Sequence, residues 1–314
     1  MPVTLPDVLR YSPCGRLTLT SGSPVMTANV TGATSIYYTP YIGAIIPIYD
    51  GSIMVPVVFS ELTNTTTNNT TNPAACTTNS NYDLFVWLNG TTVTLSRGPA
   101  WTSDTARGTG AGTTELERVQ GVLTNKVAIT NGPGANRGTY VGTIRTDGSS
   151  QANWHVGGIA ASGTAALLNV WNYYNRISVS GLIGDTTDTW TYTTATWRPA
   201  NNSNTMRASF VQGVQEEGFS ADYVTVASNT GASNYFYVSI GLDSTSAPSG
   251  YYVLASAPAA GYGVIVQGGL TTQAIGFHYV QALENSIAAG TTTWYGDNGS
   301  GAVIQSGMRY TGRF

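Results

Sequence analysis

The sequence predicts an all-β protein: two antiparallel β-sandwich-type domains behind an extended N-terminal arm. Three observations lead to this fold class. Only 9% of the 314 residues are charged, Lys126 is the single lysine, and Thr, Ser, Asn and Gly carry much of the polar surface. Helices normally place charged residues on their solvent face, and an average soluble domain has roughly 25% of them. Thr and Tyr favour strands, whereas Gly and Asn favour turns.

Residues 1–30 are expected to form the arm, which would dock on another protein. Residues 1–7 have neither a basic start nor an apolar stretch, so no secretory signal is expected. One short run, 17–20, alternates in hydrophobicity. Prolines interrupt any helix in this segment at four positions: Pro2, Pro6, Pro13 and Pro24.

Residues 31–183 are expected to form the first β domain. Asp50-Gly51 and Asn89-Gly90 each separate two strand-like runs, and such dipeptides are strong hairpin signals. Residues 63–81 are rich in Thr and Asn, which predicts an exposed loop. The best helical candidate is 113–120, where Thr113 can cap the first turn.

Residues 184–314 are expected to form a second β-sandwich, for which a jelly-roll topology fits. The glycines within 181–188 predict a linker between the domains. Beyond the linker, strand-like runs recur every 10 to 15 residues, as a sandwich requires. They are expected at nine places: 190–198, 206–214, 219–227, 234–242, 251–256, 262–268, 275–283, 292–296 and 303–310.

Charge content argues against two classes of partner, and cysteine content indicates the compartment in which the chain folds. The net charge is −3 and the arginines form no run, so neither nucleic acid nor a membrane is expected as a partner. No window of 18 apolar residues is present. Cys14 and Cys76 could pair, but two buried free thiols are favoured, which fits folding in a reducing cytoplasm.

Catalytic and metal chemistry have little support in the sequence. His155 and His278 lie far apart, so neither a metal-ligand spacing nor a histidine-dependent triad forms, and no metal or cofactor is expected. Glycan cleavage needs two carboxylates about 5–10 Å apart. Glu216 and Glu217 would point to opposite faces of a strand and could not act together. The acidic candidates are Asp185, Asp188, Glu216, Glu217, Asp222, Asp243, Glu284 and Asp297.

Aromatic residues are better candidates for a binding surface. The 19 Tyr and seven Trp exceed the seven Phe, and rings with a polar tip stack on sugars and anchor interfaces. Filling a sandwich core is the alternative role for each ring. The candidates for contact with a glycan or another protein are Trp190, Tyr192, Trp197, Trp294 and Tyr295.

Much of 15–180 resembles structural proteins of tailed bacteriophages. The similarity runs through segments of packing and turn residues, and it carries no catalytic motif. The chain departs from this pattern by extra sequence at 63–81 and 148–166. The matching segments are 15–22, 36–41, 50–51, 59–62, 82–86, 142–145 and 171–176.

The resemblance implies a virion context. Together with the low charge and the excess of Tyr and Trp, it leads us to expect a non-enzymatic virion protein, tail-fibre-like or spike-like, that is assembled in the bacterial host cytoplasm. Its partners would be other virion proteins and, through the second sandwich, a host surface polysaccharide. A capsid decoration protein or head fibre is the alternative. A capsular-polysaccharide depolymerase is a third reading, which the strand spacing does not favour.

We also expect a homo-oligomer, with a trimer favoured. A monomer with so few charges would leave strand edges and apolar rings unguarded. Closed symmetry would bury them, and sheet faces would supply the interface because no heptad repeat is present.

Overall fold

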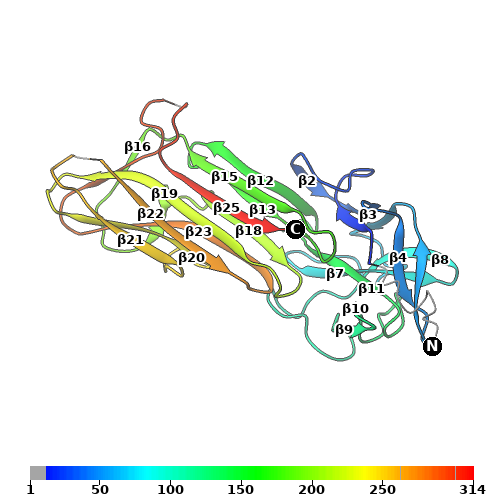
Figure 1. Ribbon diagram of the computed structural model, residues 1–314. Helices are drawn as coiled ribbons and strands as arrows, with labels where there is room; N and C mark the ends of the chain where they lie inside the picture. The colour runs from blue at the N-terminus through cyan, green and yellow to red at the C-terminus, as the bar shows by residue number, and fades with distance from the viewer. Residues whose placement is uncertain (1–11, 262, 301) are drawn as a thin grey trace, which may run out of the picture.

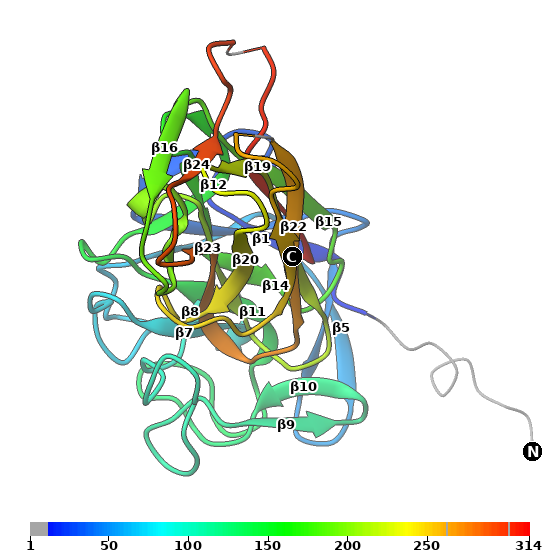
Figure 2. The ribbon, with the colours of Figure 1, turned by 90° about the vertical axis from the view of Figure 1, so that its left-hand side faces the viewer.

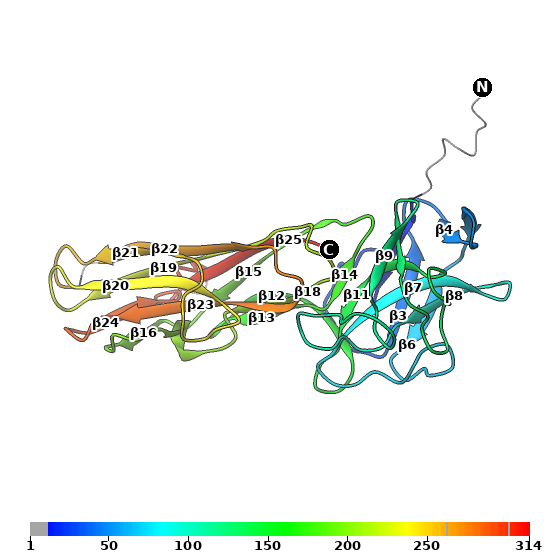
Figure 3. The same ribbon diagram turned by 90° about the horizontal axis from the view of Figure 1, so that it is seen from below.

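The computed structural model describes residues 12–261, 263–300 and 302–314, and within these ranges the fold is all-β. The described residues contain no α-helix, and one 3₁₀ turn, η2, spans Ala200–Asn202. The molecule is elongated, with a unit of small sheets at one end and a large β-sandwich at the other (Figure 1 and Figure 3). The prediction of an all-β, sandwich-like protein is confirmed.

The N-terminal unit contains three small sheets. The first has the order β1-β3-β6, made of Gly15–Thr18, Ser35–Pro40 and Leu62–Thr65. The second has the order β8-β7-β11-β10-β9, made of Thr92–Arg97, Asn81–Asn89, Thr139–Arg145, Val122–Asn125 and Leu116–Val119, with β14 (Val170–Asn172) beside β11. The third is the hairpin of β4 (Ile45–Tyr49) and β5 (Met54–Val58).

The sandwich is one 14-stranded sheet that folds into two layers. The first layer contains β12 (Ala152–Ala160), β13 (Thr164–Leu168), β18 (Arg207–Gln212), β23 (Gly276–Ser286) and β20 (Tyr235–Leu242), with β2 (Val30–Ala33) and β17 (Arg198–Pro199) at its margins. The second contains β15 (Ser178–Asp185), β25 (Gly307–Arg313), β19 (Phe219–Asn229), β22 (Val264–Thr272), β24 (Thr292–Tyr295) and β16 (Thr189–Tyr192).

The two layers are joined along both edges. On one edge, β12 pairs with β15; on the other, β21 (Tyr251–Ser256) pairs with both β20 and β22. Because β19 also pairs with β25, the strands close into a flattened ring in the order β19-β22-β21-β20-β23-β18-β13-β12-β15-β25. Figure 2 views this ring from the far end of the sandwich. Closure pairs the edges that an open sheet would expose.

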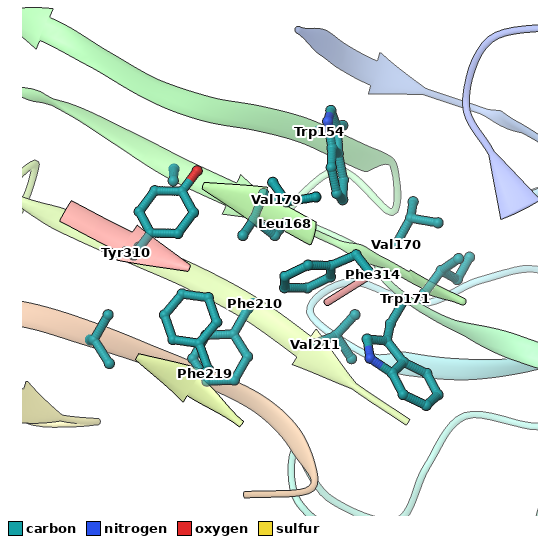
Figure 4. Packing of buried hydrophobic residues seen from close by; sticks show 14 of the residues in the cluster. Trp154, Leu168, Val170, Trp171, Val179, Phe210, Val211, Phe219, Tyr310 and Phe314 are labelled. Atoms are coloured by element: carbon teal, nitrogen blue, oxygen red, sulfur yellow. The ribbon is translucent and has the colours of Figure 1, made fainter. Parts of the chain in front are cut away.

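Aromatic rings fill the end of the sandwich nearest the N-terminal unit (Figure 4). Phe210 of β18 stacks on Phe219 of β19 with 4.0 Å between ring centroids, and Tyr310 also stacks on Phe219, at 5.6 Å. Phe314 and Trp154 meet edge to face at 5.8 Å. Buried aromatic pairs of this kind each contribute about 0.5–1.5 kcal/mol beyond the area they bury.

The predicted turns and most predicted strands are confirmed. Asn89 pairs with Thr92 across the turn at Gly90, and Tyr49 pairs with Met54 across the Asp50-Gly51 turn. Each of the nine windows expected beyond residue 188 holds a strand.

The predicted helix at 113–120 is wrong, because a hairpin forms there. Val119 of β9 pairs with Val122 of β10, and the two residues between them, Gln120 and Gly121, have φ values of 48° and 89°. Two consecutive left-handed residues form the tight turn that suits a β-hairpin. The local pairing outweighs the helix-capping character of Thr113.

The linker expected at 181–188 is also wrong, since most of it is strand β15. Gly181 is needed for packing: a Cβ there would lie 2.5 Å from the carbonyl oxygen of Val156 and 2.6 Å from the Tyr310 ring. The boundary expected between residues 183 and 184 therefore lies inside a strand, and β2, β12, β13 and β15 join the same sheet as the later strands. Glycine in a strand here marks close approach.

In the N-terminal unit, the expectation for the arm is corrected, whereas the expected loop is confirmed for 66–80, which lie between β6 and β7 and are mostly at the surface. Residues 15–18 of the predicted arm form the buried strand β1, and residues 1–11 lie outside the described part of the chain. The loop at 63–81 is held from inside by Arg97, which is fully buried and donates hydrogen bonds to the carbonyls of Thr66, Asn68 and Ala74. A buried guanidinium needs such acceptors, and backbone carbonyls supply them here.

The two cysteines are free, as expected. Cys76 is buried, and Arg97 donates a hydrogen bond to its sulfur at 3.0 Å, whereas Cys14 is only half-buried. Burial raises the pKa of the Cys76 thiol to about 11, so it stays protonated.

Candidate functional site

A cluster of aromatic side chains lies on the outer surface of the first layer, where β20 meets β21. Trp197, just before β17, has its ring centroid 6.2 Å from that of Tyr237 and 6.0 Å from that of Tyr252. Tyr237 and Tyr252 meet edge to face at 5.9 Å. Tyr252 is 54% exposed and the nearby Leu254 is 48% exposed. We call Trp197, Tyr237, Tyr252 and Leu254 the aromatic face.

Strand alternation produces this surface. In β20, Phe236 and Val238 point into the sandwich and are fully buried, so Tyr237 between them points outward. Tyr237 is the register partner of Leu254, which places their side chains on the same face. The aromatic face is therefore fixed by the pairing of β20 with β21 and does not depend on a loop.

The structure places the five aromatic candidates, which were chosen from the sequence, in different surroundings. Trp190 and Trp294 are register partners in β16 and β24, and both are buried in the core. Tyr192 donates to the carbonyl of Thr196 at 2.9 Å. Tyr295 forms a hydroxyl–hydroxyl hydrogen bond with Ser228. Of the five candidates, Trp197 alone belongs to the aromatic face.

Two acidic candidates, Glu284 and Asp185, meet a common partner inside the sandwich. The side chain of Glu284 is fully buried and accepts hydrogen bonds from Nε1 of Trp190 at 2.8 Å and Nε of Arg198 at 2.7 Å. Asn201 links the two carboxylates, because its backbone N–H donates to Glu284 and its side-chain amide donates to Asp185. Burial places both carboxylates out of reach of a large substrate.

Burial also shifts the titration of Glu284. Loss of hydration raises the pKa of its carboxyl to about 7, although Arg198 and the N–H groups of Trp190 and Asn201 favour the ionised form. A shifted carboxyl often marks a catalytic site. Here the same side chain is fully enclosed, so its shift reflects a structural role.

Glu216 and Glu217 lie in a turn after β18, which corrects the expectation that a strand would point them apart. Both approach Arg176, at 3.5 Å each, and they form further ion pairs with Arg118 and Arg313. The turn lets adjacent carboxylates share one arginine. Three of the four carboxylate oxygens take part in these ion pairs, and the pair of Glu216 with Arg118 joins the sandwich to β9 of the N-terminal unit.

The remaining acidic candidates lie apart. Asp243 forms an ion pair with His278 at 2.6 Å, Asp188 is exposed next to β16, and Asp297 is buried beside a turn. Asp222 alone faces an open groove on the second layer. Within the described ranges, no group of three or more His, Cys, Asp or Glu side chains could hold a metal ion. No helix in the described part of the chain is long and apolar enough to span a membrane.

Sequence reasoning missed three members of the aromatic face, Tyr237, Tyr252 and Leu254. Tyr237 was recognisable from the alternation of tyrosines with buried residues in 235–240. The pair Tyr251-Tyr252 carries a signal too, because adjacent residues in a strand point to opposite faces. Nothing in the sequence places Trp197 beside this pair, since that contact depends on how β21 closes the ring.

Comparisons with known proteins add little to this picture. No protein-family model matches the sequence, and no curated protein matches it. Among solved structures, the mosquito-larvicidal Cry4Aa toxin from Bacillus thuringiensis aligns with a TM-score of 0.20 and 8% sequence identity. That alignment covers 89% of this chain and 49% of the toxin chain. Similarity at this level carries no argument about fold or function.

Proposed function

We propose that this chain is a non-enzymatic structural protein of a tailed-bacteriophage particle, resembling a tail fibre or spike. The observation that carries the proposal is that the elongated molecule has two structurally different ends. The N-terminal unit, which bears much of the resemblance to phage structural proteins, forms one end, and the sandwich forms the other (Figure 3). The aromatic face lies on the sandwich. An attachment end and an outward end are what such a part requires.

The placement of the carboxylates supports a role without catalysis. Glycoside hydrolysis requires two carboxylates about 5–10 Å apart across an accessible sugar. Glu284 and Asp185 are enclosed, and Glu216 and Glu217 are tied up in ion pairs. This arrangement disfavours the capsular-polysaccharide depolymerase reading.

The expected partners are other virion proteins, a host surface polysaccharide and further copies of the chain, with a trimer favoured. Exposed strand edges give little support for an oligomer, because β21 and β12 pair the edges of the sandwich. Exposed apolar side chains still support one, since surface rings and leucines such as those of the aromatic face commonly mark an interface. Trp197→Ala and Tyr252→Ser would then weaken self-association measured by light scattering.

Localisation in purified phage particles tests the proposal. Immunogold labelling or cryo-electron microscopy should place the chain on the tail, with a copy number that follows tail symmetry. A copy number that follows capsid symmetry would instead favour the decoration-protein or head-fibre alternative. Absence of the chain from purified virions would overturn the whole proposal.

A further inference from the structure

A groove with several polar side chains crosses the outer surface of the second layer, on the opposite side of the sandwich from the aromatic face. Its volume is about 530 Å³, within the range of roughly 300–1,000 Å³ typical of ligand pockets. Strands β15, β25 and β19 form its floor. Its polar side chains are Ser180, Ser220, Asp222, Arg309 and Thr311.

Strand register sorts these side chains into two rows. In the first row, Ser180 pairs with Thr311, Thr311 with Ser220, and Ser220 with Thr271, so hydroxyl groups cross four strands. In the second row, Leu182 pairs with Arg309, Arg309 with Asp222, and Asp222 with Gly269. Directly opposed residues have Cβ atoms about 4.5–5.5 Å apart. A cation and an anion therefore lie side by side next to a row of hydroxyls.

Arg309 differs from every other arginine in the described ranges. Each of the others donates at least one hydrogen bond within the chain, whereas Arg309 donates none to a described residue, although Asp222 is its register partner. Arg309 is exposed. Its N–H groups are therefore free to bind a ligand in the groove.

Asp222, by contrast, is held in place through one oxygen. Its Oδ1 accepts hydrogen bonds from the hydroxyl of Tyr251 at 3.0 Å and from Nε2 of Gln267 at 3.4 Å. No described residue donates to its Oδ2. The hydrogen bond to Asp222 raises the pKa of the Tyr251 hydroxyl, so Tyr251 stays a donor.

Gly269 makes room for this arrangement. A Cβ at Gly269 would lie 2.3 Å from Oδ1 of Asp222 and 2.8 Å from the Tyr251 hydroxyl. The absent side chain lets the Tyr251 ring reach across β22 to Asp222. The carboxylate is thus oriented by three residues of neighbouring strands, with one oxygen left for a ligand.

We propose that this groove binds a neutral saccharide through a pair of vicinal hydroxyls. One hydroxyl donates to Oδ2 of Asp222, and its neighbour accepts from the guanidinium of Arg309. Further sugar hydroxyls meet the row of Ser180, Thr311 and Ser220, and the Tyr251 ring borders the groove.

Charge and backbone pairing argue for this occupant over others. Arg309 and Asp222 have no net charge together, and Asp222 would repel a carboxylate bound to Arg309. An extended peptide could not add to this surface as a strand, because β15, β25 and β19 already have partners on both sides. The proposal is independent of the aromatic face and of the location of the chain in a phage.

Binding of defined oligosaccharides to the purified full-length chain tests the proposal. The probes are maltohexaose, isomaltohexaose, mannohexaose and, as an acidic comparison, hexagalacturonic acid, followed by saturation-transfer NMR and calorimetry. At least one neutral hexasaccharide should bind, and Arg309→Ala and Asp222→Asn should each weaken its Kd at least tenfold. Arg309→Lys should recover only part of the affinity, because it lacks the planar fork.

One variant serves as a matched control. Arg313→Ala removes another exposed arginine of the same strand and face, outside the groove. It should change the Kd less than twofold, and thermal melts should confirm that every variant folds. Trp197→Ala tests the competing binding surface, the aromatic face. Three results would overturn the proposal: no neutral probe binds, hexagalacturonic acid binds more tightly than all of them, or Trp197→Ala abolishes binding while Arg309→Ala does not. None of these results bears on the virion-localisation test.

Discussion

The junction end of the sandwich and its far end use charged side chains in opposite ways. At the junction, Asp83 is fully buried and accepts two hydrogen bonds from Arg107, which also donates to the carbonyl of Gly213 after β18. Glu216 and Glu217 extend this charged interface with three arginines: Arg118, Arg176 and Arg313. The few charges of the chain are concentrated where two units must keep one relative placement.

The far end contains almost no charge pairs. The sequence has no lysine or arginine between Arg207 and Arg309. Glu284 in this part receives its counter-charge from Arg198, outside that stretch. The outer surfaces of the two layers instead present hydroxyls, rings and Arg309, which donates no hydrogen bond to a described residue. The comparison teaches that ion pairs fix the joint between the units, whereas the outer surfaces of the sandwich leave polar groups free for a ligand.

Removal of a buried junction charge should have the largest effect. Asp83→Ala leaves Arg107 buried without its counter-ion, and breaking such a pair costs about 3–5 kcal/mol of unfolding free energy. Glu115→Ala, which breaks the exposed pair with Lys126, is the matched control and should leave stability nearly unchanged. Urea denaturation measures both. Equal effects of the two variants would contradict the assigned role of the junction.

A second prediction concerns the buried far-end carboxylate. Because the pKa of Glu284 is raised from 4.5 to about 7 in the fold, the folded state binds the extra proton between these values. Unfolding free energy should therefore fall as pH rises from 4.5 to 7, by at most about 1.4 kcal/mol per pH unit from this group. Glu284→Gln removes the titrating group and should flatten the dependence of unfolding free energy on pH in this range. Urea denaturation at pH 5 and pH 8 checks this, and identical pH slopes in the two proteins would refute it.

The sequence predicted strands well where alternation was clear and poorly where glycine interrupts it. The run 234–242 alternates and gave β20. In β12, Gly157 has a φ of 78°, and a Cβ there would lie 2.7 Å from Ile183 and 3.0 Å from the carbonyl of Thr164. Gly157 in β12 and Gly181 in β15 permit the close approach that brings these two strands together and closes the ring. The same glycines weaken the strand signal in the sequence.

The candidate surfaces were less predictable than the strands, because each joins segments distant in sequence. The aromatic face needs Trp197 beside Tyr252, and the groove needs Arg309 beside Asp222. Such neighbours follow from strand order and register, which the sequence pattern does not specify. Asp222 could be predicted as a candidate only as one acid among several; its orientation by Tyr251 and Gln267 required the paired sheet.

The smallest expected effect concerns His278, which lies near the inter-unit contacts. Burial lowers the pKa of His278, but hydrogen bonds with Asp243 and the carbonyl of Ile275, together with the charge of Asp104, raise it more, so the net shift is upward from 6.5. A raised imidazolium pKa stabilises the fold fully below pH 6.5, and this contribution is lost as pH rises through the folded-state value.

Asp243→Asn tests this pair with little disturbance of the backbone, because Asp243 has a φ of 52° and Asn tolerates that conformation. The variant should lose less than about 1 kcal/mol at pH 6 and still less at pH 8.5, since Asp243 is partly solvated. NMR should show the ring of His278 titrating at a lower pH in the variant, with His155→Gln used to assign the two histidine signals. An unchanged titration would mean that Asp243 does not stabilise the imidazolium of His278.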